Sequence, residues 1–177
     1  MPPVPQVGNV GIHKASPQYP LDIQGDTAIR NITSGNIIMF LDATNGNFTL
    51  NASDTTRMMY LAGGSTSFSI GKGAGTVQGT DSIAIGVGSG TSQGTNCLAL
   101  GSQSGLTQAN NCMAIGYQAG QSQAADSIAI GNLAGNSTQA TQSIALGNSA
   151  GRLNQGSQNC AIGQFSGETN QGQYSVA

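Results

Sequence analysis

From residue 67 onward, large apolar and small positions alternate in a five-residue pattern that ends in glycine. It reads Ser82-Ile83-Ala84-Ile85-Gly86 in one copy and Cys97-Leu98-Ala99-Leu100-Gly101 in the next. Alternate residues of a strand fall on opposite faces, so one face carries two large apolar residues and the other carries alanine and Ser or Cys. Neither face carries a charge, whereas a strand with one wet face would alternate apolar with polar residues. We expect a strand packed on both faces, against the interior of its own coil and against another chain.

The pattern recurs with a period of 15 residues, which becomes 16 in the last two steps. The glycines that end it are Gly71, Gly86, Gly101, Gly116, Gly131, Gly147 and Gly163. A second glycine always follows four residues later, and a glutamine follows that. The glutamines are Gln78, Gln93, Gln108, Gln123, Gln139, Gln155 and Gln171. The extra residue of the longer copies falls between the second glycine and the glutamine, and we interpret that place as a loop.

A period of 15 is too short for a helix and a strand with their turns. It favours a β-solenoid of seven coils, each with two short strands and two turns. The glycines then serve the corners. Coils about 4.8 Å apart would make a rod about 34 Å long. Identical residues stack in such a rod, so we expect the glutamines to form a side-chain amide ladder. The alternative interpretation is that the column is only a turn position that tolerates polar residues.

The recurring motif Asp81-Ser82-Ile83-Ala84-Ile85-Gly86 resembles the head repeats of YadA-type trimeric adhesins. It also resembles related repeats in phage tail fibres and in the surface fibres of large DNA viruses. The resemblance covers residues 67–177 and implies a left-handed parallel β-roll with three chains around a common axis. The family's repeats are commonly 14 residues long, so the spacing here departs at the corners.

Residues 1–66 do not repeat, and we expect a small β module there that connects or caps the roll. Residues 37–44 and 47–50 predict two strands around Asn45-Gly46, a favoured two-residue hairpin turn. Residues 63–66 mark the boundary. The final residues, Ser175-Val176-Ala177, match the start of the repeated strand. Because the chain stops within that strand, we expect a fragment of a longer protein.

Charged residues are scarce. They make up 7% of the chain, with a net charge of −2 and five Lys and Arg residues in total. So few cations cannot build the basic face that binds nucleic acid. The chain has no run of 18 apolar residues that would suggest membrane insertion, and no secretory leader is visible.

The residues offer no enzymatic constellation. His13 is the one histidine and has no positioned partner for general-base catalysis. The left-handed β-helix acyltransferases use hexapeptide coils and a catalytic histidine, which the repeats lack. The glycines do not form a phosphate loop, and the acidic residues are too scattered for a calcium solenoid. We therefore expect no catalytic residues, no cofactor and no metal site.

Three cysteines occur in the repeats. Cys97 and Cys112 replace the small serine of successive coils, and Cys160 replaces a large apolar residue. No CxxC or Cys/His cluster indicates zinc. A disulfide between Cys97 and Cys112 is conceivable from their adjacency, but disulfide geometry is demanding, so free thiols are favoured.

These features favour a non-enzymatic homotrimer, a fibre or adhesin head that attaches to a receptor or glycan on a host or cell surface. A virion surface fibre is the first location expected, and a bacterial surface is the alternative. Outward residues in the turns are candidates for recognition: Lys72, Val87, Tyr117, Leu133, Arg152 and Phe165. A purely structural spacer or capsid-associated protein is the competing hypothesis. An ice-binding solenoid is a remote third, because the threonines Thr76 and Thr91 do not continue into a ladder.

Overall fold

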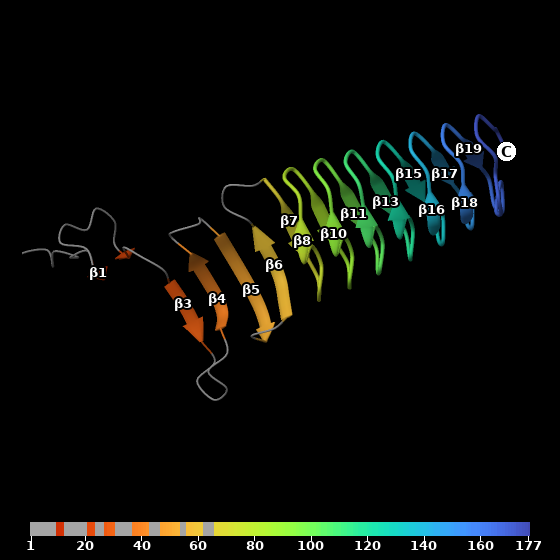
Figure 1. Ribbon diagram of the computed structural model, residues 1–177. Helices are drawn as coiled ribbons and strands as arrows, with labels where there is room; N and C mark the ends of the chain where they lie inside the picture. The colour runs from red at the N-terminus through yellow and green to blue at the C-terminus, as the bar shows by residue number, and fades with distance from the viewer. Residues whose placement is uncertain are drawn as a thin grey trace, which may run out of the picture.

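The computed structural model describes residues 66–177 throughout and, before them, the backbone of six separate strands. These six are β1 (Val10–Ile12), β2 (Leu21–Ile23), β3 (Thr27–Arg30), β4 (Ile37–Asp42), β5 (Asn47–Ser53) and β6 (Thr56–Leu61). The described residues form strands and turns and no helix. The predicted all-β solenoid is confirmed, and it forms a rod of stacked coils (Figure 1).

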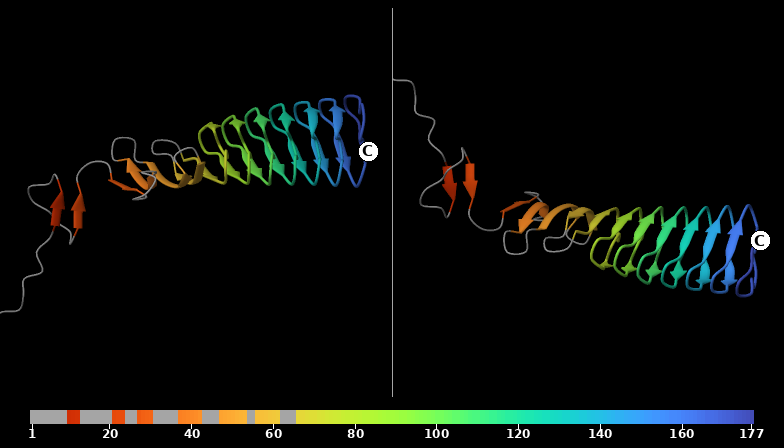
Figure 2. Two further views of the ribbon diagram at one scale, coloured as in Figure 1. Left: turned by 90° about the horizontal axis from the view of Figure 1, so that it is seen from below. Right: turned by 90° about the horizontal axis from the view of Figure 1, so that it is seen from above.

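Two parallel sheets run along the rod. The first contains β7 (Phe68–Ile70), β9 (Ile83–Ile85), β11 (Leu98–Leu100), β13 (Met113–Ile115), β15 (Ile128–Ile130), β17 (Ile144–Leu146) and β19 (Cys160–Ile162). The second contains β8 (Val77–Gln78), β10 (Ser92–Gln93), β12 (Thr107–Gln108), β14 (Ser122–Gln123), β16 (Ser137–Gln139) and β18 (Leu153–Gln155). Figure 2 shows the two sheets facing each other across each coil.

The structure has about six full turns rather than seven. Seven copies contribute a strand to the first sheet, but only six contribute one to the second. Beyond β19 the chain adds two isolated bridges, Leu153 with Thr169 and Cys160 with Val176. A seventh coil is therefore begun in register but is not closed by full strands.

Equivalent residues stack in register from coil to coil. Ala84 pairs with Ala99, and Ala99 pairs with Ala114. Backbone groups outside the strands continue the ladder; for example, Gly88 N–H donates to the carbonyl of Lys72 at 2.8 Å. Even the turns are thus hydrogen-bonded to the coil before, which leaves few free backbone groups and makes a stiff rod.

The interior of the coil is built from small residues. The alanines of the first sheet point inward and are fully buried from Ala84 onward, while the large apolar residues point outward. Strands of two or three residues leave a narrow interior, which an alanine layer and the glutamine side chains fill. The expected packing against the coil's own interior therefore falls on the small face of the strand.

The close stacking explains the first glycine of each copy. A Cβ on Gly101, whose φ is +129°, would lie 2.5 Å from the carbonyl oxygen of Gly116. No side chain fits that gap, and L residues rarely adopt this φ. The second glycine has a different neighbour, because a Cβ on Gly105 would meet the amide carbon of Gln108 at 2.6 Å.

The extra residue of the longer copies lies in a strand, so its assignment to a loop is wrong. Thr138 is the middle residue of β16 and has a φ of +55°, and Asn154 has the same φ in β18. One added residue in the left-handed conformation makes a bulge, and the register of the glutamines after it is kept. Gln123 accordingly still pairs with Gln139.

The first sheet continues through an antiparallel meander at its N-terminal end. β3, β4, β5 and β6 pair in order, and β6 pairs with β7, which gives eleven strands in one sheet. This continuity runs across the boundary expected at residues 63–66. The predicted hairpin exists, but its last described pair is Asp42 with Asn47. The Asn45-Gly46 turn, like His13, lies outside the described residues.

Candidate functional site

The glutamines of the second sheet lie in one buried column inside the rod. Gln78 donates from Nε2 to Oε1 of Gln93 at 3.1 Å, and Gln93 donates to Gln108 at 2.8 Å. The chain of bonds continues from Gln108 to Gln123 at 2.7 Å and from Gln123 to Gln139 at 3.0 Å. Each of these amides thus provides the hydrogen bond that the oxygen of the next one needs, because buried polar groups must find partners.

The glutamine column also joins the two sheets. The Nε2 of Gln123 donates to the carbonyl of Met113 across the coil at 3.1 Å, and Gln139 donates to that of Ile128 at 2.8 Å. The ladder is interrupted once, between Gln139 and Gln155, where Oε1 of Gln155 is buried without a partner. It resumes with a bond from Gln155 to Gln171 at 3.4 Å.

A second buried column precedes the strands of the first sheet. Ser82 occupies it and donates from Oγ to the carbonyl of Gly94 at 2.9 Å, while its oxygen accepts from the N–H of Cys97 at 3.1 Å. Ser127 and Ser143 donate to the equivalent carbonyls at 2.8 Å. The column therefore ties the start of each strand to the turn of the next coil.

Cys97 and Cys112 occupy this column in adjacent coils, with free thiols. Their Sγ atoms donate to the carbonyls of Ala109 at 2.9 Å and Ala124 at 3.1 Å. Contact with the Cys112 side chain lowers the pKa of Cys97 to about 7, helped by backbone N–H groups and opposed by burial. Contact with Cys97 raises the pKa of Cys112, together with burial. The two thiols thus titrate as a pair rather than independently.

The outer face of the first sheet is a strip of large apolar side chains. Six of them are 37–57% exposed: Ile70, Ile83, Leu100, Ile144, Leu146 and Ile162. The remaining large apolar residues of the strip are half-buried by their neighbours. In contrast, the outer face of the second sheet carries exposed hydroxyls at Ser92, Thr107 and Ser122, with exposed Val77 in the same column of the first coil.

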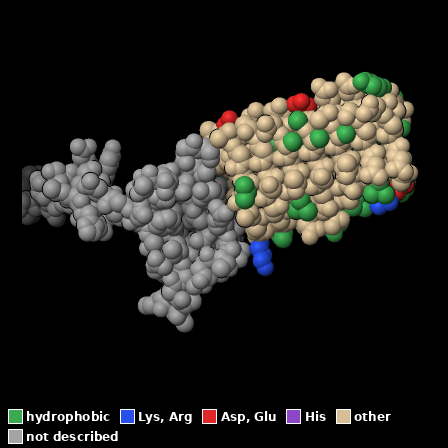
Figure 3. Space-filling view, in the orientation of Figure 1, with side chains coloured by type: hydrophobic (Ala, Val, Ile, Leu, Met, Phe, Trp, Pro, Cys, Tyr) green, Lys and Arg blue, Asp and Glu red, His purple; other side chains and the backbone are tan. Residues whose placement is uncertain are grey.

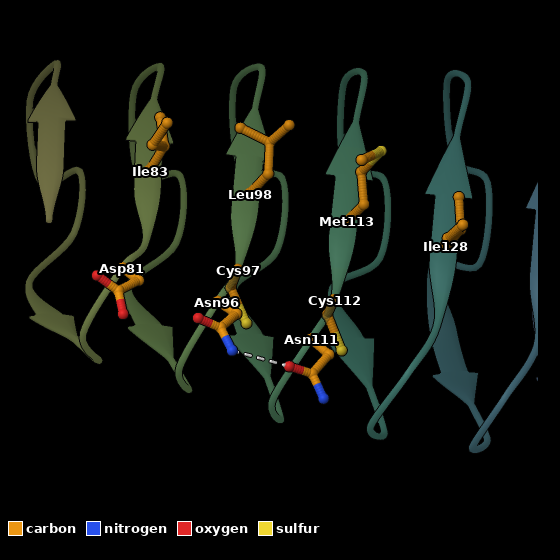
Figure 4. A pocket seen from close by; sticks show the side chains of 9 residues that line it. All are labelled: Asp81, Ile83, Asn96, Cys97, Leu98, Asn111, Cys112, Met113 and Ile128. Atoms are coloured by element: carbon orange, nitrogen blue, oxygen red, sulfur yellow. Dashed lines mark hydrogen bonds between the residues drawn. The ribbon is translucent and has the colours of Figure 1, made fainter. Parts of the chain in front are cut away.

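A shallow groove of about 400 Å³ runs along one edge of the apolar strip, across four coils (Figure 4). Its floor is formed by Ile83, Leu98, Met113 and Ile128, and both buried cysteines line it. Its rim contains Asp81 and two polar residues that the sequence analysis did not single out, Asn96 and Asn111.

Asn96 and Asn111 belong to an exposed ladder of side-chain hydrogen bonds. Asn96 donates from Nδ2 to Oδ1 of Asn111 at 3.1 Å, and Asn111 donates to Asp126 at 2.9 Å. All have a φ near +60°, a conformation that Asn and Asp tolerate better than other residues with a side chain. The sequence signal for this ladder is the Asp or Asn that stands directly before the small residue in four successive repeats. Later repeats have Gln142 and Gln158 at this position, which makes the signal harder to recognise.

The six candidate recognition residues do not form one cluster. Lys72, Val87 and Tyr117 share one column in the turn after the first-sheet strand, and all three are exposed. Leu133 and Phe165 occupy the next position of that turn. These five therefore lie along one edge of the rod, spread over its length.

Arg152 lies elsewhere, beside the second sheet, where its Nε donates to Oε1 of Glu168 at 3.1 Å. Within residues 66–177 charged side chains are few, and one face of the roll shows them only at scattered points (Figure 3). Nor do three or more His, Cys, Asp or Glu side chains converge anywhere in the described part of the chain. No helix there is long and apolar enough to cross a membrane.

Comparison of the chain with protein-family models, curated proteins and solved structures finds no match.

Proposed function

We propose that this chain forms part of a non-enzymatic, three-chain fibre that holds a recognition surface on a host or cell surface. The observation that carries the proposal is the apolar strip on the outer face of the first sheet. Both the repeats' resemblance to trimeric adhesin heads and the physical argument from this strip point to a covered face.

The strip is a single contiguous patch that runs along the rod. It spans seven strands about 4.8 Å apart and two side-chain positions per strand, which gives roughly 300 Å² of apolar surface. The largest apolar patch of a soluble protein is often functional at this size. The outer face of the second sheet carries mainly hydroxyls, so it suits the solvent side of an assembly.

Three copies with their apolar strips turned inward would bury the strips around one axis. Each strip repeats at the coil spacing, so identical parallel rods can match one another coil by coil. Such a closed arrangement leaves the turn edge with Lys72, Val87 and Tyr117 accessible. These residues vary from coil to coil while the framework repeats, as expected for a recognition surface on a rigid scaffold.

Light scattering coupled to size exclusion tests the assembly. The expected mass is three times 17.7 kDa. A folded monomer would overturn the proposed assembly and would favour a single-chain solenoid, with ice binding among the functions to examine.

Binding assays test the recognition role separately. We expect the trimer to bind intact host cells or a glycan array and the variant Val87→Ser/Tyr117→Ser to bind at least about tenfold less. This variant replaces exposed turn residues with the residue found at 102 in the same column, so its fold and mass should not change. A trimer that binds no cells or glycans would instead support a structural spacer or capsid-associated protein.

A further inference from the structure

The buried cysteines occupy equivalent places in neighbouring coils. Leu98 and Met113 pair in register, so the residues before them, Cys97 and Cys112, are stacked one strand spacing apart, about 4.8 Å. Their side chains are 3% and 2% exposed. Figure 4 shows both sulfur atoms pointing the same way along the rod, so the thiol of Cys97 is turned toward the coil of Cys112.

Packing alone does not require sulfur here. The column takes serine at positions 67, 82, 127 and 143, and the serine hydroxyl makes the same bond to the turn carbonyl. A thiol is a weaker hydrogen-bond donor and acceptor than a hydroxyl. Two adjacent coils have therefore exchanged good hydrogen bonds for a pair of soft, polarisable atoms.

We propose that Cys97 and Cys112 form a two-thiolate site for a soft monovalent metal ion, with Cu(I) as the ion to test. A metal–thiolate bond is about 2.3 Å long, as for zinc, so an ion midway between two sulfur atoms needs them about 4.6 Å apart. The strand ladder spaces the backbones of the two residues by nearly that distance. The Cys97 sulfur already faces the coil of Cys112, and the Cys112 side chain turns back from the Ala124 carbonyl toward Cys97 when the ion binds.

Binding is a ligand exchange without a redox step. Each thiol releases its proton to solvent, and each sulfur donates an electron pair to Cu(I), so two protons leave and the site gains one net negative charge. The backbone N–H groups of Cys112 and Ser127 hydrogen-bond to the two sulfur atoms and offset that charge.

The number of ligands selects the ion. In residues 66–177 no third His, Cys, Asp or Glu joins this pair, whereas a structural zinc takes four such ligands. Thiolate and thioether sulfurs favour Cu(I), which is stable with two ligands. The groove beside the pair provides an entry path, and its floor contains the thioether of Met113.

The test uses the full chain, reduced and without oxygen, in a titration with Cu(I) against a coloured Cu(I) chelator. We expect one ion per chain by native mass spectrometry. Cys97→Ser and Cys112→Ser should each weaken binding at least about 100-fold, and both should fold because serine fills this column elsewhere. Cys160→Ser is the matched control, since Cys160 lies outside the column, and it should bind within twofold of the unmodified chain. Equal binding by the unmodified chain and the double serine variant would overturn the proposal.

X-ray absorption on the unmodified, Cu(I)-loaded protein gives a test that does not depend on the variants. The expected spectrum shows two sulfur ligands at about 2.2–2.3 Å and no others. Three or more ligands, or any nitrogen ligand, would place the copper elsewhere. The inference concerns one chain alone and does not depend on the proposed assembly.

Discussion

Gln93 donates its side-chain amide to Oε1 of Gln108, exactly one copy of the repeat further along the chain, at 2.8 Å inside the rod. Gln108 in turn donates to Gln123. The two sheets have almost no large apolar side chains between them, so the glutamine column takes the place of a hydrophobic core. A buried polar column stabilises a fold only while every member is paired.

Replacement of Gln108 by leucine should therefore destabilise the roll strongly. The change leaves Oε1 of Gln123 buried without its donor and removes a bond to the carbonyl of Leu98. We expect a loss of about 2–4 kcal/mol in the free energy of unfolding, measured by urea denaturation at fixed protein concentration.

The matched control is Gln118→Leu. Gln118 makes a similar bond to Gln103 at 2.7 Å, but on the exposed surface, and leucine already occupies this column at position 133. Its cost should stay below about 0.5 kcal/mol. Equal effects of the two substitutions would show that the buried ladder has no special role in stability.

Much of this fold follows from the local pattern. The alternation at residues 82–86 predicts a strand, and its repetition predicts the parallel stack and the glutamine column. The pattern could not say which face of the strand points inward, because that depends on the width of the coil. With two or three residues per strand the interior admits Ala84 but not Ile83 or Ile85, so the large residues point outward.

Other features depend on backbone conformation that a residue name does not specify. An added residue such as Thr138 can enter a loop or a bulge, and only its φ distinguishes the two. The amide ladder at Asn96 and Asn111 was missed because Asp, Gln and Tyr share its column. The cysteine pair was recognised as adjacent, but the carbonyls that its thiols reach depend on side-chain direction.

Substitution of Gly101 by alanine should cost about 3 kcal/mol or more. The new Cβ would lie 2.5 Å from a backbone oxygen of the next coil, and the φ of +129° is strained for any L residue. Gly88→Gln is the control: its φ is +64°, the nearest atom to a new Cβ is 3.9 Å away, and Gln103 has this conformation one coil later. We expect it to cost about 1 kcal/mol at most. Thermal unfolding followed by circular dichroism checks both, and a tolerated Gly101→Ala would contradict the close stacking of the corners.

Deletion of Thr138 should be tolerated. The residue forms a bulge that the preceding coils lack, and Gln123 and Gln139 already pair across the change from a shorter to a longer coil. Removal moves that change one coil further and should cost no more than about 1 kcal/mol. Deletion of Ala129 is the comparison, because losing one residue inside β15 exchanges the inward and outward faces of the strand. Urea denaturation should show a folded protein for the first deletion and none for the second; two unfolded proteins would mean that the bulge is essential.

Two carboxylates on the apolar strip should separate the chains without unfolding them. Leu100 and Ile144 are 39% and 38% exposed in the single chain, so glutamate at both positions can remain solvated there. In an assembly that covers the strip, each carboxylate would lose its water without gaining a partner, at a cost of several kcal/mol. We expect Leu100→Glu/Ile144→Glu to shift the mass from three chains to one while the circular dichroism spectrum keeps its β signature. Ser122→Glu, on the outer face of the second sheet, should leave the mass unchanged. If the double variant keeps the mass of three chains, the strip is not the interface, and the chains must associate through another surface.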